Sequence, residues 1–316
     1  MIKQYYVGID LGGTFIKAGI VGKNGKILAK EKAPTQGEQG AETVAKNIAD
    51  VIRLLLEKTG ISTDEIIGVG MGVPGMIDSK KGEVVYSSNL KWRHFPIAKA
   101  VESLSGLPVK IANDANVAAL GEAKFGAAKG CRDVVLLTLG TGVGGGVLVN
   151  GQLMEGNCSA GAELGHMVIE GNGKSCTCGR KGCLEAYASA TALIRDTKET
   201  MQAHPESLMW EVGSLEDVDG KTAFAYRDKD VYAKRVVDDY IRCLGFGIVN
   251  FANVFRPEKI LLGGGVCAEG ENLIRPLRQI MDRDLFGGDM GPAVPVDIAS
   301  LGNSAGILGA AALWAD

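Results

Sequence analysis

Three cysteines and one histidine near the middle of the chain form a metal-binding pattern. They follow the spacing His166-x9-Cys176-x-Cys178-x4-Cys183, so one imidazole and three thiols fall within eighteen positions. Thiolate and imidazole are the ligands of structural zinc, and a set of three cysteines and one histidine fills all four tetrahedral positions. We therefore predict one structural Zn²⁺ per chain, which organises the site and does not activate water.

The alternative is a set of free thiols or a redox pair. A redox motif is typically Cys-x-x-Cys, whereas the close pair here is Cys-x-Cys. The number and type of ligands favour zinc. Three basic neighbours are expected to favour the thiolates by lowering their pKa, namely Lys174, Arg180 and Lys181.

Three glycine-rich segments that follow predicted strands could bind phosphate. They are residues 10–14, 140–144 and 263–265. Glycine lets the backbone approach a ligand closely, so that successive N–H groups can converge on phosphate oxygens. Each segment alone is explained by a tight turn, but three of them, two at equivalent positions of a repeat, predict a nucleotide site. A dinucleotide-binding fingerprint is excluded at 140–145, because a strand follows where that motif requires a helix.

The elements that must position these loops are duplicated along the chain. Residues 7–28 and 134–154 both read as strand, glycine-rich turn, strand, Asn-Gly turn and strand. Asn-Gly favours a type I′ turn, in which both central residues have positive φ. Helices are predicted at 41–59, 115–125, 231–253 and 305–314, and further strands at 66–73, 109–112 and 259–262.

Alternating strands and helices predict an α/β fold with a mixed sheet and two domains. The smaller α/β domain is expected to comprise residues 1–115 plus a C-terminal helix at about 303–316. The larger α/β domain, with the zinc knuckle, is expected to comprise residues 116–302.

Composition limits the classes of function. The 316 residues are 46% hydrophobic and 22% charged, as in packed soluble proteins. A net charge of −3 offers no basic field, so neither nucleic acid nor a membrane is an expected partner. The first residues lack the apolar run of a signal peptide, and seven cysteines indicate a reducing compartment, so we expect a cytoplasmic protein.

Four motifs are spread along the chain: Asp10-x-Gly-Gly-Thr14, Asn113-Asp114, Glu163-Leu-Gly-His166 and Cys176-x-Cys-Gly-x-x-Gly-Cys183-Leu-Glu185. Together they resemble the ROK family (repressors, open reading frames, kinases), and the resemblance covers essentially the whole chain. Within that family, the cysteine motif is most similar to that of bacterial ATP-dependent glucokinases.

The resemblance implies an actin/hexokinase-like (ribonuclease H-like) duplicated fold with an interdomain cleft. It also implies that Asp10 helps to hold Mg²⁺ and that ATP is bound by three glycine loops. These are Gly12, Gly13 and Thr14 as the first phosphate loop, Gly140, Thr141 and Gly142 as the second, and Gly263, Gly264 and Gly265 beside the adenosine.

For the sugar, the resemblance implies that Asp114 is the general base on the C6 hydroxyl and that Asn113 holds a neighbouring hydroxyl. Both residues are equally explained as helix N-caps, because they lie between a strand and a helix. The remaining implied sugar contacts are Glu163, Glu185, the ring nitrogen of His166 that does not bind zinc, and the backbone of Gly75.

The expected activity is ATP- and Mg²⁺-dependent phosphorylation of glucose to glucose 6-phosphate by a homodimer or homotetramer. A kinase for fructose, mannose or an N-acylhexosamine shares every motif. A sugar-sensing repressor would need a helix-turn-helix before the first strand, for which the segment before Tyr5 leaves no room. Polyphosphate as the phosphoryl donor would favour a basic channel, which the composition does not indicate.

Overall fold

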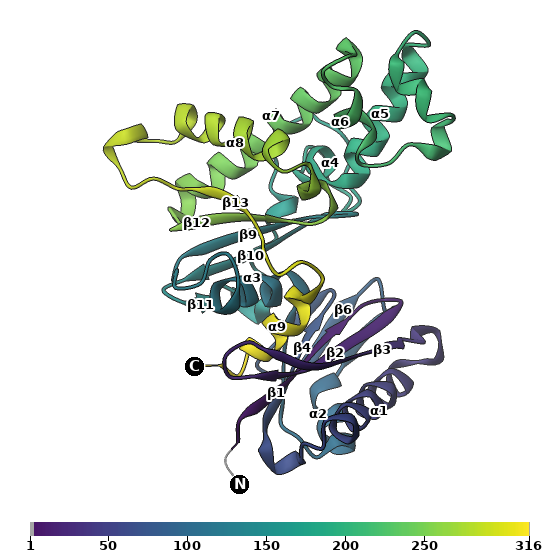
Figure 1. Ribbon diagram of the computed structural model, residues 1–316, viewed down its shortest axis with the longest axis vertical. Coiled ribbons are helices and arrows are strands. Elements are labelled where there is room, and N and C mark those ends of the chain that lie inside the picture. The colour runs from purple at the N-terminus through teal and green to yellow at the C-terminus, as the bar shows by residue number, and fades with distance from the viewer. Residues whose placement is uncertain (1–2, 316) are drawn as a thin grey trace. The chain divides into compact units, whose positions relative to one another are not determined.

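The computed structural model describes residues 3–315, which divide into two compact units (Figure 1). Unit 1 contains the described chain up to Arg132, then Gly146–Ala162 and the chain from Ser300 onward. Unit 2 contains Asp133–Gly145 and Glu163–Ala299. This division differs from the predicted one at residues 116–132 and 146–162, which pack with unit 1.

Unit 1 is built on a five-stranded mixed sheet in the order β3-β2-β1-β4-β8. Strands β1, β2 and β3 form the predicted antiparallel hairpins, and β4 and β8 extend the sheet in parallel. The mixed sheet that the sequence predicted is therefore confirmed. The strands are β1 (Tyr5–Leu11), β2 (Phe15–Gly22), β3 (Ile27–Pro34), β4 (Ile66–Val73) and β8 (Val109–Asn113).

Helices cover both faces of this sheet (Figure 1). Helices α1 (Ala41–Thr59) and α2 (Ile97–Ser105) lie on one face, and α3 (Asp114–Phe125) and α9 (Ala305–Ala312) lie on the other. Successive side chains of a strand point to opposite faces. Accordingly, Val7 belongs to the core beneath α1, whereas Tyr6 packs with Ile307 of α9.

A small antiparallel sheet follows β4, in a segment where the sequence pattern predicts no strands. Its strands are β5 (Met76–Asp78), β6 (Glu83–Ser87) and β7 (Trp92–Phe95). They are three to five residues long, and none alternates strictly between apolar and polar residues, the pattern that identifies a half-buried strand.

Unit 2 contains the parallel strands β9 (Val134–Leu139), β12 (Lys259–Gly263) and β13 (Val296–Ile298). The full sheet has the order β11-β10-β9-β12-β13, with β10 (Val143–Val149) and β11 (Gln152–Leu153), and its residues from Gly146 to Leu153 are counted with unit 1. The longest helix of unit 2, α7, packs against α5 and α8. The helices are α4 (Glu185–Ala188), α5 (Ala190–Ala203), α6 (Thr222–Tyr226), α7 (Val231–Phe255) and α8 (Glu271–Asp284).

The two Asn-Gly turns differ in conformation. Asn150 and Gly151 have φ of 55° and 78°, as the predicted type I′ turn requires. In the first hairpin only Gly25 has positive φ, at 80°. There the N–H of Gly22 donates to the carbonyl of Lys26 at 2.9 Å, so the loop is longer than a two-residue turn. The type I′ prediction is thus confirmed for the second hairpin and wrong for the first.

Across residues 3–315, no helix has both the length and the apolar character that crossing a membrane requires.

Helix α9 lies so close to the sheet that two strands carry glycine beneath it. A Cβ atom on Gly8 of β1 would lie 1.9 Å from the carbonyl oxygen of Ile307. A Cβ atom on Gly70 of β4 would lie 1.8 Å from the carbonyl oxygen of Ala310. Both distances are far below van der Waals contact, and the obstacle is backbone. Only glycine therefore fits at these positions unless α9 moves.

We predict that Gly70→Ala lowers the free energy of unfolding by about 2 kcal/mol or more, because the helix must shift to admit the methyl group. Gly37→Ala is the control, since no atom lies within 4 Å of the added Cβ. Urea unfolding of both variants and the wild type measures the difference. Equal stability of the two variants would contradict the close packing of α9.

Candidate functional site

The four predicted metal ligands lie together in unit 2. The ligand atoms of His166, Cys176, Cys178 and Cys183 are all within 4.8 Å of one another. The Sγ atoms of Cys178 and Cys183 are 3.7 Å apart, and Sγ of Cys176 lies 3.7 Å from Nδ1 of His166. Tetrahedral zinc with Zn–S of about 2.3 Å and Zn–N of about 2.0 Å needs edges of about 3.8 and 3.5 Å. The donor set and its spacing therefore fit a zinc ion.

Local backbone pairing brings the ligands together. Isolated bridges join Val168 to Cys183 and Ser175 to Lys181, so the chain folds back on itself between the first and last ligand. The N–H of Cys176 donates to the carbonyl of Arg180 at 2.8 Å, which closes the turn containing Cys178.

The environments of the three thiols are different. Burial raises the pKa of Cys183 to about 12, and burial is also the main cause that raises the pKa of Cys176. A backbone hydrogen bond from Arg180 lowers the pKa of Cys178. The expected lowering of the thiol pKa is therefore found for Cys178 alone, where the backbone N–H of Arg180 contributes more than the charge of its side chain. Lys174 instead forms an ion pair with Asp196, at 2.6 Å.

Glu185, the first residue of α4, links the cysteine cluster to the second glycine loop. Its Oε1 accepts a hydrogen bond from the hydroxyl of Thr177 at 2.8 Å and lies 3.5 Å from Sγ of Cys176. Its Oε2 accepts from the N–H of Val143 at 3.1 Å. A Cβ atom on Gly142 would lie 2.3 Å from this Oε2. The Glu185 carboxylate thus fixes the position of the second glycine loop relative to the cysteine cluster.

Thr177 is a residue that the sequence reasoning missed. It lies between the two cysteines of the Cys-x-Cys pair, and its hydroxyl orients Glu185. Threonine between metal ligands forms no recognisable pattern, so only its contact reveals the role.

The first glycine loop joins β1 to β2 in unit 1. The N–H of Gly12 donates to the carbonyl of Phe15 at 2.9 Å, which makes a tight turn with Gly13 and Thr14 exposed. Asp10, the next-to-last residue of β1, forms an ion pair with Lys17 at 3.1 Å. The two residues are direct partners in the β1–β2 ladder, so strand register places them side by side.

Asp10 also lies against the beginning of helix α9. A Cβ atom on Gly306, the second residue of that helix, would lie 2.6 Å from the carboxyl carbon of Asp10. The carboxylate is therefore packed between Lys17 and the helix and is still partly exposed, with a quarter of its side chain accessible.

The other two glycine loops lie in unit 2. The N–H of Gly140 donates to the carbonyl of Gly142 at 3.0 Å, and the carbonyl of Gly140 accepts from the N–H of Ala190 in α5. Gly263 ends β12. Gly264 follows with φ of 101°, and a Cβ atom there would lie 2.1 Å from the carbonyl oxygen of Leu139. A glycine at 264 thus lets this turn approach the end of β9, just before the second glycine loop.

Asn113 and Asp114 lie at the junction of β8 and α3. Asn113 is the N-cap of α3, because its Oδ1 accepts from the N–H groups of Ala115 at 2.9 Å and Asn116 at 3.4 Å. Its Nδ2 donates to the carbonyl of Gly75 at 3.1 Å, so these two predicted sugar contacts are neighbours. Asp114 is the first residue of the helix and its side chain is exposed, with Oδ1 accepting from the N–H of Ala115 at 2.9 Å.

The predicted site residues are divided between the two units. Unit 2 contains Glu163 and Glu185 in addition to the metal ligands and two glycine loops, and Glu163 is exposed immediately before the turn that contains His166. Unit 1 contains Asp10, Gly12, Gly13, Thr14, Gly75, Asn113 and Asp114.

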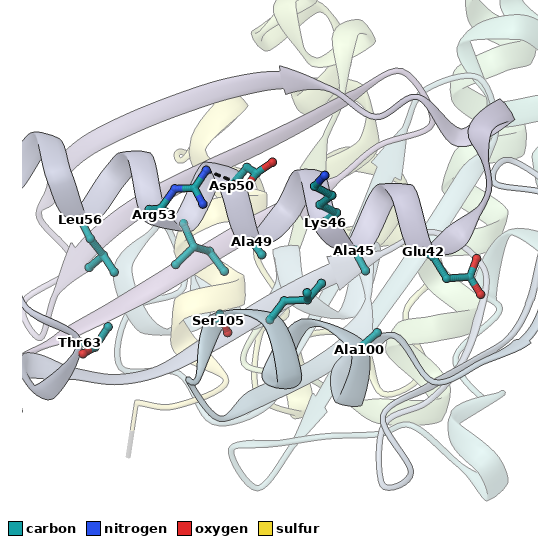
Figure 2. A pocket seen from close by; sticks show the side chains of 12 residues that line it. Glu42, Ala45, Lys46, Ala49, Asp50, Arg53, Leu56, Thr63, Ala100 and Ser105 are labelled. Carbon is teal, nitrogen blue, oxygen red and sulfur yellow. Dashed lines mark hydrogen bonds and ion pairs between the residues drawn. The ribbon is translucent and has the colours of Figure 1, made fainter.

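A groove of about 660 Å³ between α1 and α2 contains none of the predicted site residues (Figure 2). Its floor is formed by small and aliphatic side chains such as Ala45, Ala49 and Leu56. The charged side chains at its edge include Asp50 and Arg53, which form an ion pair at 2.9 Å. Nothing in its lining resembles a phosphate or sugar site.

Comparison with known proteins gives similarity over nearly the whole chain. The sequence matches the profile of the ROK family over residues 6–316. The glucokinase of Thermotoga maritima is 40% identical over 99% of this chain and 98% of its own length. The glucokinase of Halalkalibacterium halodurans is 39% identical over 98% and 94%.

A solved structure extends this similarity to the fold. The ROK family glucokinase of Streptomyces griseus, in complex with glucose and AMPPNP, is 38% identical and covers 98% of both chains with a TM-score of 0.80. The actin/hexokinase-like class predicted from the sequence is confirmed by this similarity.

Proposed function

The chain belongs to the ROK family, and we propose that it is a glucokinase that transfers the γ-phosphoryl group of ATP to the C6 hydroxyl of glucose. The observation that carries the proposal is the match, over nearly the full length of both chains, to a glucokinase that binds glucose and AMPPNP. Three of the proposed site residues are held by local interactions: Asp10 by its ion pair with Lys17, Asn113 by its capping hydrogen bonds, and Glu185 by its bonds to Thr177 and Val143.

We propose Asp114 as the general base. A sugar hydroxyl is a poor nucleophile until a positioned base accepts its proton, and a carboxylate can do so within hydrogen-bond reach. Asp114 is exposed at the first position of α3, where a negative charge is favourable next to the unpaired N–H groups of the helix. Capping is performed by the adjacent Asn113, so Asp114 is not required for that role.

The side-chain amide of Asn113 has two N–H groups, and one of them donates to Gly75. The second N–H can orient a sugar hydroxyl. The Asn113 amide is fixed by three hydrogen bonds, to Ala115, Asn116 and Gly75, so a donor there is held in one direction. Preorganised donors of this kind lower the entropic cost of placing the substrate. The proposed sugar ligands of unit 2 are Glu163, His166 and Glu185.

For the nucleotide, we propose that the loops at 12–14 and 140–142 bind the phosphates and that 263–265 borders the adenosine. Phosphoryl transfer is catalysed mainly by positioning and by neutralising charge on the phosphate oxygens. The Mg²⁺ that accompanies ATP would be held beside Asp10, and it would supply neutralising charge there.

We also propose that the cysteine cluster binds one structural Zn²⁺. His166 presents Nδ1 to the thiols, so its Nε2 is directed away from the metal and can contact sugar. Glu185 is tied to the cluster through Thr177 and Cys176. The metal would thereby fix two proposed sugar ligands and, through the N–H of Val143, the second phosphate loop.

The sugar itself is the least constrained part of the proposal. A kinase for mannose, fructose or an N-acylhexosamine would use the same residues. An ATP-coupled assay across glucose, mannose, fructose, N-acetylglucosamine and N-acetylmannosamine decides among them, and polyphosphate in place of ATP tests the donor. Turnover on none of these sugars would overturn the proposal and favour a sugar-sensing regulator.

A homodimer or homotetramer, a cytoplasmic location and the lack of a nucleic-acid partner stay predictions.

We predict that Asp114→Asn lowers kcat by about 10²- to 10⁴-fold, the usual contribution of a general base. The amide keeps the size of the side chain but cannot accept the proton, so binding of AMPPNP should not change. The control is Asp50→Asn on the surface of α1, which should retain full activity. Near-normal turnover by Asp114→Asn would contradict the assignment.

We predict one zinc per chain in protein purified without chelators, measured by elemental analysis. Cys183→Ser should lose the metal, because it removes a buried ligand of the cluster. Cys131→Ser, outside the cluster, should keep it. Metal-free wild-type protein, or equal zinc content in the two variants, would refute the zinc site.

A further inference from the structure

A buried threonine holds both ends of the first phosphate loop. Thr35, which follows β3, has no solvent-exposed surface. Its hydroxyl donates to the carbonyl of Gly12 at 2.7 Å, and its backbone N–H donates to the carbonyl of Thr14 at 2.9 Å. No motif in the sequence drew attention to this residue.

The hydroxyl bond fixes the orientation of a peptide group in the loop. In a trans peptide the carbonyl of one residue and the N–H of the next point to opposite sides. Because Thr35 holds the carbonyl of Gly12 on the buried side, the N–H of Gly13 is directed to the opposite side, where Gly13 and Thr14 are exposed. Two successive glycines impose little restriction of their own on this peptide. The hydrogen bond from the Thr35 hydroxyl restricts the orientation of this peptide instead.

Thr35 is itself held in place by helix α1. The side-chain Nδ2 of Asn47 donates to the carbonyl of Thr35 at 3.3 Å and to Oε1 of Gln36 at 3.0 Å. Gln36 has φ of 55°, so the chain turns sharply after Thr35 and this turn is fixed by Asn47. The position of the hydroxyl is therefore set by the core helix and not by the loop it contacts.

We infer that Thr35 is a positioning residue for ATP: its hydroxyl presets the Gly12–Gly13 peptide so that the N–H of Gly13 faces the nucleotide phosphates. The inference rests on the proposed function, because it assigns the loop at 12–14 to phosphate binding. It concerns the nucleotide and predicts no effect on the sugar.

The test compares Thr35→Val, which keeps the shape but removes the hydroxyl, with Thr35→Ser, which keeps the hydroxyl. We expect Thr35→Val to raise the KM for ATP and the Kd for AMPPNP about three- to tenfold, the value of a lost hydrogen bond. The KM for glucose should not change. Thr35→Ser should bind AMPPNP like the wild type, because its hydroxyl can make the same bond.

The Kd for AMPPNP is measured by calorimetry, without turnover, so it tests Thr35 separately from the proposed reaction. Wild-type protein that binds AMPPNP but phosphorylates no sugar would refute the kinase and leave the Thr35 comparison decisive. Equal affinity of Thr35→Val and wild type would overturn the inference, as would failure of the wild type to bind AMPPNP. A loss in Thr35→Val that affects ATP and glucose alike, or that Thr35→Ser shares, would indicate a merely structural role and also overturn it.

Discussion

The close contact between helix α9 and its neighbours is the constraint on which unit 1 depends. Glycines at 8 and 70 let the helix lie against the sheet, and Gly306 lets its first turn lie against Asp10. A Cβ atom on Gly309 would lie 1.8 Å from the carbonyl oxygen of Val117, so α3 is packed just as closely. Since α3 begins at Asp114, one helix fixes the positions of a proposed magnesium ligand and the proposed base.

A carboxylate has the corresponding role in unit 2. Glu185 accepts hydrogen bonds from Thr177 in the cysteine cluster and from the N–H of Val143 after the second glycine loop. Without its partners, a carboxylate at the start of a four-residue helix would have many rotamers available. The contacts select one, and they make the geometry of the second glycine loop depend on the geometry of the cysteine cluster.

The sequence predicted those features whose signals are local. The Cys/His cluster, the proposed zinc site, is recognised by residue type and spacing, and α1 and β4 by periodicity, with the observed bounds of Ala41–Thr59 and Ile66–Val73. The short strands β5–β7 and the role of Thr35 depend on contacts between distant segments. The pKa values of Cys176 and Cys183 depend on burial, which the charges of neighbouring residues in the sequence do not reveal.

The order of segments along the chain has a consequence for biosynthesis. Helix α9 belongs to unit 1, yet all of unit 2 precedes it in the sequence. A ribosome releases the five strands, α1 and α3 of unit 1 early, when one face of their sheet has α3 but still lacks α9. Domains usually fold in the order of their synthesis. Here the first unit to begin folding is the last to finish, and the glycines of β1 and β4 lack their helix partner until unit 2 has been made.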